Sequence, residues 1–91
     1  MELSAVLERN PGAAYRIYDG EGVIVQAETM EVHVVNPTGA RIWELLDGRR
    51  TVAEVVEAIC TEFETSREEA ERDVLEFLAG FEVQGLVRRA P

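Results

Sequence analysis

The sequence has few of the residues that build catalytic or metal sites. Its 91 residues include one cysteine, Cys60, and one histidine, His33. A single cysteine excludes a disulfide within the chain and is compatible with a reducing cytosol. No second histidine and no cysteine cluster is available to complete a zinc site around His33. Metal binding and histidine or thiol catalysis are therefore disfavoured.

Long apolar runs are also missing. No stretch approaches the roughly 18 residues that a membrane span needs, and the N-terminus lacks the basic segment and apolar core of a secretory signal. The sequence contains no P-loop, no dinucleotide-binding glycine fingerprint and no nucleophile elbow. The sequence therefore carries no recognisable catalytic motif, and we expect a cytoplasmic protein that needs no cofactor and does not bind membranes.

Basic residues are scarce relative to acidic ones. Nine basic residues stand against eighteen acidic residues, which gives a net charge of −9. The imbalance is sharpest between Thr51 and Glu82. An acidic surface of this kind repels phosphate backbones and anionic lipids, so it disfavours nucleic-acid partners and favours a neutral or basic one. The acidic run could also hold a paired-carboxylate site, although a solvated helix face is the commoner explanation.

The first part of the chain reads as strands because its apolar residues alternate. We predict strands over Tyr15–Tyr18, Val23–Ala27 and Glu31–Val35, separated by turns at 19–22 and 28–30. Turns this short imply an antiparallel meander of three strands. One face of this sheet must be covered by helices, and one outer strand should keep a free edge.

The stretch 36–48 joins the strands to a helical region. Asn36 is a good N-cap, Pro37 suits the first helical position, and Gly48 suits the left-handed residue that ends a helix. Between them, apolar residues give this short helix one apolar face. Trp43 lies on that face, where core packing is a commoner role than ligand stacking.

Two further helices begin at capping boxes, residues 51–54 and 66–69, and each continues as an apolar stripe at spacings of three and four. Cys60 lies on the first stripe and is expected to be a small core residue. Gly85 should end the last helix in a Schellman motif. We expect residues 1–13 to form a frayed or lightly docked N-terminal arm and residues 14–88 to form the domain. Arg88 onward is expected to be a solvated tail.

These elements predict an α+β fold in which a three-stranded antiparallel sheet is followed by a three-helix cluster, similar to a winged helix-turn-helix. That arrangement often binds DNA. Here the helix that would recognise DNA begins with acidic residues, namely Glu68, Glu69, Glu71, Asp73 and Glu76. A DNA-binding regulator is therefore an alternative rather than the main hypothesis, and so is a structural dimerisation module that uses the free edge.

The order and spacing of the motifs resemble the PqqD family over about Tyr15 to Val87. The resemblance is carried by Asn36-Pro37-Thr38-Gly39-Ala40, Ile42-Trp43, Leu45-Leu46-Asp47-Gly48, Thr51-Val52-Ala53-Glu54, Asp73-Val74, Phe77-Leu78 and Gly85-Leu86-Val87. Two residues depart from the family pattern. Val35 stands where the family usually has Leu before Asn, and Met30 stands where the second turn often has Gly.

The resemblance implies a non-catalytic adaptor in pathways for ribosomally made, modified peptides, of which PQQ synthesis is one. The leader segment of the precursor peptide would add as a strand to the third strand of the sheet, against the third helix. It would then be presented to a modifying enzyme, often a radical-SAM protein. Carried over to this chain, the peptide-binding residues are Glu31, Val32, His33, Val34 and Val35 on the strand, and Asp73, Val74, Phe77, Leu78 and Phe81 on the helix. The same edge could also form a homodimer.

Overall fold

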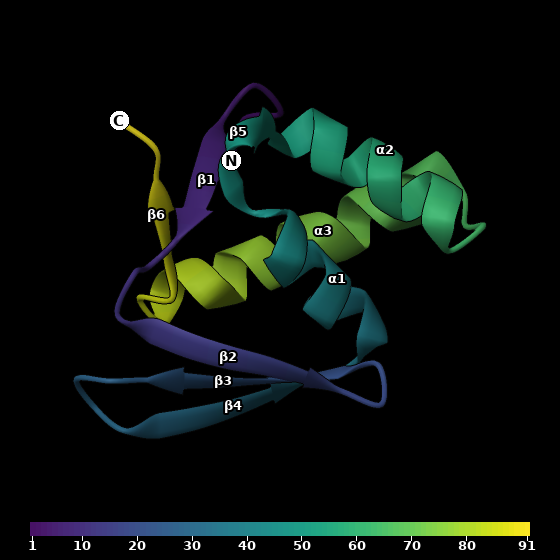
Figure 1. Ribbon diagram of the computed structural model, residues 1–91. Coiled ribbons are helices and arrows are strands. Elements are labelled where there is room, and N and C mark those ends of the chain that lie inside the picture. The colour runs from purple at the N-terminus through teal and green to yellow at the C-terminus, as the bar shows by residue number, and fades with distance from the viewer.

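The computed structural model describes residues 1–91 as two small antiparallel sheets and three helices (Figure 1). The first sheet has the order β2-β3-β4 and contains β2 (Ala13–Tyr18), β3 (Glu21–Gln26) and β4 (Glu31–Val35). The second sheet has the order β5-β1-β6 and contains β1 (Val6–Arg9), β5 (Asp47–Thr51) and β6 (Val87–Arg89). The helices are α1 (Pro37–Leu45), α2 (Val52–Glu62) and α3 (Arg67–Val83).

The first sheet is the predicted meander. β2 and β3 are joined by Asp19-Gly20, whose φ angles of 52° and 81° are those of a type I′ hairpin turn. β3 and β4 are joined by residues 27–30, and Met30 takes a φ of 60°. A left-handed backbone is unusual for a residue with a side chain. Glycine, which often stands here in the family that the sequence resembles, takes such a backbone without strain.

The start of α1 agrees with the sequence, but its end does not. The side-chain oxygen of Asn36 accepts a hydrogen bond from the backbone N–H of Gly39 at 2.9 Å, and Pro37 is the first helical residue. The prediction that Gly48 ends this helix is wrong, because α1 ends at Leu45. Gly48 does have a positive φ of 79°, but it lies within β5, where the pairing with β1 shifts register.

The later helix boundaries follow their local signals. The capping box of Thr51 and Glu54 is complete, with both reciprocal hydrogen bonds present. Ser66 accepts a hydrogen bond from the N–H of Glu69, but the Glu69 carboxylate accepts from a neighbouring threonine instead of closing the second box. At the end of α3, Gly85 has a φ of 73° and donates to the carbonyl of Glu82. The next N–H donates to the carbonyl of Phe81, as a Schellman motif requires.

The N-terminal segment is a strand in the core of the fold, so the expected frayed arm is wrong. β1 is the central strand of the second sheet and pairs with both β5 and β6. Ala5 and Leu7 are 8% and 1% exposed. The burial of every second residue is the pattern of a strand. The apolar residues at 3, 6 and 7 are also spaced as in a helix, so in a segment this short the sequence does not reveal the strand.

The C-terminal segment is also more ordered than the sequence suggests. The expected solvated tail contains β6, which pairs with β1, although Arg88 and Arg89 keep exposed side chains. Strands therefore precede, interrupt and follow the helices, and the predicted order of one sheet followed by three helices is wrong. The antiparallel α+β class and the three helices are confirmed, whereas the winged-helix likeness stays a prediction.

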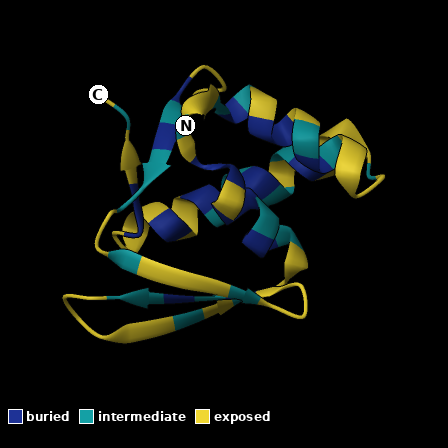
Figure 2. Ribbon diagram, in the orientation of Figure 1, coloured by how far each residue is buried: buried dark blue, intermediate teal, exposed yellow.

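The core is formed by the inner sides of the three helices together with residues of β1, β3 and β6, as the dark blue segments of Figure 2 show. Trp43 is 0% exposed and packs edge-to-face against Tyr15 and Phe81, with ring centroids 5.7 and 5.5 Å away. Core packing is thus its role, as predicted. Cys60 is partly buried against the same core, and its thiol donates to the carbonyl of Thr65.

Candidate functional site

The open margin of β4 is the feature on which the predicted site depends. β4 is an outer strand of the first sheet and pairs only with β3. The N-terminal segment, which could have covered this margin, belongs to the second sheet instead. In Figure 1, β4 is the lowest strand and lies far from β1 and β6. The predicted free edge is therefore present.

The hairpin between β2 and β3 fixes which backbone groups of β4 face this edge. The two residues that flank a two-residue hairpin turn, here Tyr18 and Glu21, form a hydrogen-bonded pair. Bonded and non-bonded pairs then alternate along an antiparallel ladder. Counting along the observed register makes His33 a bonded partner of β3. The N–H and C=O groups of Val32 and Val34 consequently point outward, ready for another strand.

The side chains of β4 divide between two environments. Val32 and Val34 lie on the face away from the helices and are 61% and 66% exposed. His33 and Val35 lie on the inner face and are half-buried, while Glu31 is exposed at the start of the strand. The Nε2 atom of His33 is buried without a hydrogen-bond partner. Buried polar atoms are usually hydrogen-bonded, so this nitrogen has an unsatisfied hydrogen-bonding position close to the open edge.

The predicted contribution of α3 is smaller than expected. Val74 and Leu78 are fully buried and Phe81 is 3% exposed, so these three residues form core and do not line a surface groove. Asp73 and Phe77 are partly exposed and are the only members of the predicted set on α3 that reach the surface. An apolar stripe at helical spacing predicts the buried side of a helix, and the sequence pattern does not separate its centre from its margin.

Phe77 connects the core to the surface through a close contact with α1. An ideal Cβ built on Gly39 would lie 2.5 Å from Cε1 of the Phe77 ring. The absence of a side chain at Gly39 therefore allows the ring to lie directly on the α1 backbone. Gly39 belongs to the motif on which the family resemblance rests, but its packing role cannot be seen without the structure.

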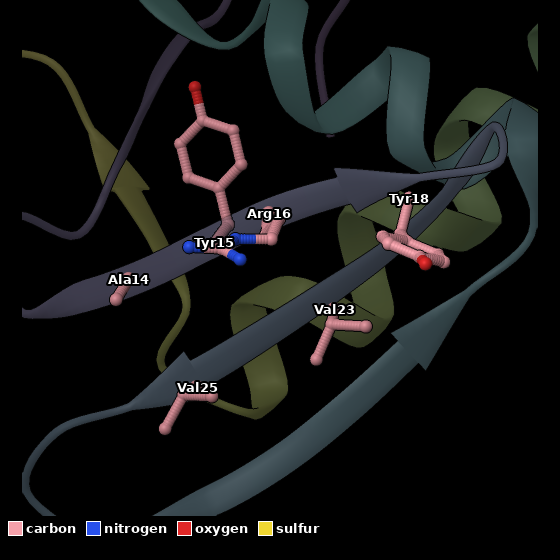
Figure 3. A pocket seen from close by; sticks show the side chains of 6 residues that line it. All are labelled: Ala14, Tyr15, Arg16, Tyr18, Val23 and Val25. Carbon is pink, nitrogen blue, oxygen red and sulfur yellow. The ribbon is translucent and has the colours of Figure 1, made fainter.

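Two surface hollows are present, and neither lies between β4 and α3. The first, of about 410 Å³, lies on the outer side of β2 and β3 (Figure 3). Its lining residues are Ala14, Tyr15, Arg16, Tyr18, Val23 and Val25. The second, of about 430 Å³, lies along α2 and is lined mainly by charged and polar residues. The groove predicted beside β4 is thus not open in this structure.

The ionisable groups give no sign of acid–base chemistry at the edge. The pKa of Glu62 is lowered because its carboxylate accepts hydrogen bonds from the Arg41 guanidinium, and that of Asp47 is lowered by the backbone N–H groups of Arg50 and Arg49. Both acids lie outside the first sheet. No three His, Cys, Asp or Glu residues are grouped so that they could hold a metal ion.

None of the three helices combines the length and apolar character needed to cross a membrane.

What the arrangement offers is an unpaired strand edge with two apolar residues on one side and a histidine on the other. Such an edge is suited to pairing with another extended chain.

Known structures share this fold. The structure described as "TbiB1 in Complex with the TbiA(beta) Leader Peptide" is 28% identical, with a TM-score of 0.80 over 89% of this chain and 94% of that chain. "Lasso peptide synthetase B1 complexed with the leader peptide" is 24% identical, with a TM-score of 0.79 over 92% of this chain and 99% of that chain, and supports the fold alone. Among curated proteins, none is similar enough to count as a match.

The family model described as "Coenzyme PQQ synthesis protein D (PqqD)" matches residues 21–87. This range begins with β3 and extends to the first residue of β6, so it includes the open strand, all three helices and the contact between Gly39 and Phe77. The match spans well over half of the chain, which therefore belongs to the PqqD family.

Proposed function

We propose that this protein is a non-catalytic adaptor that binds the leader segment of a ribosomally made precursor peptide and presents it to a modifying enzyme. The observation that carries the proposal is the open edge of β4 in a PqqD-family chain. A structure of similar fold and 28% identity is a complex with a leader peptide, which supports the same role here.

The binding mode that we propose is strand addition to β4. The outward N–H and C=O groups of Val32 and Val34 can form up to four hydrogen bonds, each contributing about 0.5–1.5 kcal/mol. One or two buried leader side chains would add about 1.5–3 kcal/mol each, and ordering the peptide would cost about 2–5 kcal/mol. The central values favour the complex by about 4 kcal/mol, and the upper part of the range, about 8–10 kcal/mol, corresponds to micromolar or tighter affinity.

Selectivity would come from the side chains of the added strand. Because side chains alternate along a strand, every second leader residue would lie on the inner side of the sheet. There, His33 offers a buried nitrogen without a partner and Phe77 offers a half-buried ring. We propose that these two residues, together with Asp73 and Glu31 at the ends of the site, determine which leader sequences bind. Phe81 packs against Phe77 from within the core, where Val74 and Leu78 are also buried.

The partner that we propose is a modifying enzyme of the same pathway, with a radical-SAM protein as the specific expectation, and the site of action is the cytoplasm. A homodimer through β4 would use the same backbone groups, so it would compete with the leader. The comparisons lend no support to the DNA-binding alternative.

Amide hydrogen exchange tests the proposal residue by residue. The probe is a synthetic peptide that covers the leader of a short precursor encoded beside this gene. Saturating peptide should slow exchange at the amides of Val32 and Val34. By the same count along the sheet, Tyr15 and Ile17 face the opposite margin, on β2, and serve as internal controls that should not change. Unaltered exchange at Val32 and Val34 would refute strand addition to β4.

A further inference from the structure

The outer face of the first sheet is apolar and has nothing packed on it. The register aligns Ala14, Val25 and Val32 in one row and Arg16, Val23 and Val34 in the next, with Tyr18 at the end. Three of these side chains, those of Tyr18, Val34 and Val32, are 69%, 66% and 61% exposed. The hollow in Figure 3 lies on the part of this face formed by β2 and β3, where Tyr18, Val23 and Val25 are among its lining residues. A contiguous exposed apolar patch on a small protein usually marks an interaction site.

Charge around this outer sheet face is almost entirely negative. Asp19 and Glu21 lie at one end of the sheet, and Glu28 and Glu31 lie at the other. None of these four carboxylates takes part in an ion pair. The one basic residue on the face, Arg16, is also without an ionic partner.

A second copy of the chain is a poor occupant for this face. In such a dimer the acidic margin of one copy would face the acidic margin of the other, and each copy carries a net charge of −9. Like charges placed opposite one another oppose association. The complementary surface is apolar at its centre and carries arginine or lysine around it.

We infer that the outer sheet face is a docking surface for another protein, whose contact region is apolar at its centre and basic at its margin. Identifying that protein as the modifying enzyme rests on the proposed function. The inference goes beyond leader binding, because it assigns a separate surface and a separate partner.

The size of the face predicts how docking is regulated. The three strands have six, six and five residues. With strands about 4.8 Å apart and about 3.3 Å per residue, they cover roughly 300 Å². A typical stable interface uses about 800 Å² on each partner. A leader strand added to β4 would enlarge the face by about a third and place alternate side chains on it. The enzyme should therefore dock weakly on the free adaptor and more tightly on the adaptor that carries its peptide.

A binding assay that measures enzyme affinity and leader affinity separately tests this inference. The probe is the purified modifying enzyme encoded beside this gene, titrated against the adaptor with and without saturating leader. Tyr18→Glu places a charge on β2, at the margin of the sheet opposite β4. It should weaken enzyme binding about tenfold or more, as expected for an interface aromatic, while leader affinity stays within about twofold. The double variant Glu21→Lys, Glu28→Lys should weaken enzyme binding by reversing the charge of the margin.

Val83→Glu is the matched control, because Val83 is apolar, 88% exposed and located on α3. This substitution should change neither affinity. If Tyr18→Glu binds the enzyme as tightly as the native protein, or if the native protein does not bind the enzyme at all, the docking surface is refuted. If the native protein does not bind the leader, the proposed function is refuted instead. Sedimentation of the native protein as a dimer that Tyr18→Glu dissociates would assign the face to a second copy and overturn the inference.

Discussion

The ring of Phe77 on α3 occupies the space in which a side chain of residue 39 on α1 would stand. Its Cε1 and Cζ atoms lie 2.5 and 2.8 Å from an ideal Cβ at Gly39. Both residues lie in the stretches that resemble the PqqD family. The contact sets how closely two helices approach and also fixes a ring that is proposed to meet the leader.

Gly39→Ala should therefore destabilise the native protein. The clash would cost about 1–3 kcal/mol, which exceeds the roughly 1 kcal/mol that alanine gains over glycine within a helix. In a Phe77→Ala background the clash is gone, and the same substitution should stabilise the protein by up to about 1 kcal/mol. Urea unfolding followed by Trp43 fluorescence measures both effects. The same sign in both backgrounds would contradict the packing role of Gly39.

Val34→Pro should weaken leader binding by about tenfold or more, because proline removes one of the backbone donors that face the open edge. The fold should survive, since this N–H is not used within the sheet and the side chain is 66% exposed. Val34→Ala is the control that shortens the side chain and keeps the donor. Calorimetry with the synthetic leader measures the affinities, and equal values for both variants would argue against pairing at this residue.

Arg9→Met should cost about 2 kcal/mol of unfolding free energy. The Arg9 guanidinium donates to the carbonyls of Trp43 and Glu44 at 3.1 and 2.8 Å, at the end of α1, and it lies over the Tyr15 ring. Hydrogen bonds that involve a charged group contribute about 1.5–3 kcal/mol. Arg16→Met removes an exposed arginine that has no ionic partner, and this control should change stability by less than about 0.5 kcal/mol. Equal stability of the two variants would show that the N-terminal strand is not held as described.

Acid should remove the contribution of Glu62 to stability. The pKa of this carboxyl in the folded protein lies below the usual 4.5 because of Arg41. Its contribution is therefore complete above the unfolded-state pKa and disappears as the pH falls through the lower folded-state pKa. Glu62→Gln should be less stable than the native protein at neutral pH, and the difference should disappear as the pH falls below the folded-state pKa of Glu62. Glu76→Gln removes a carboxylate without an ionic partner and should differ little from the native protein in stability at neutral pH. A stability difference for Glu62→Gln that stays constant as the pH falls would contradict the linkage.

Local signals predicted the elements well because their physical causes are local. Asn36, Thr51 and Gly85 mark helix boundaries through contacts with residues close in the chain, and the structure contains all three contacts. Alternating apolar residues predicted the three strands of the first sheet for the same reason. The family resemblance then pointed to β4, which is indeed an open edge.

The second sheet was missed because its pairing is not local. Leu7 pairs with Arg89 across most of the chain, and Val6 pairs with Thr51 across about half of it. β1 and β6 have only four and three residues, too few for a pattern to be recognised. The burial of Val74 and Leu78 was also hidden, since the same apolar stripe predicts both a core face and the wall of a groove.

The pairing of β1 has a consequence for the order in which the molecule assembles. β2, β3 and β4 follow one another through tight turns, whereas β1 must wait for β5 and then for β6, the last strand in the chain. Contacts between distant segments form more slowly than contacts between neighbours. The open edge of β4 should thus be complete early in folding, and the second sheet, which pairs β1 with β6, should form last.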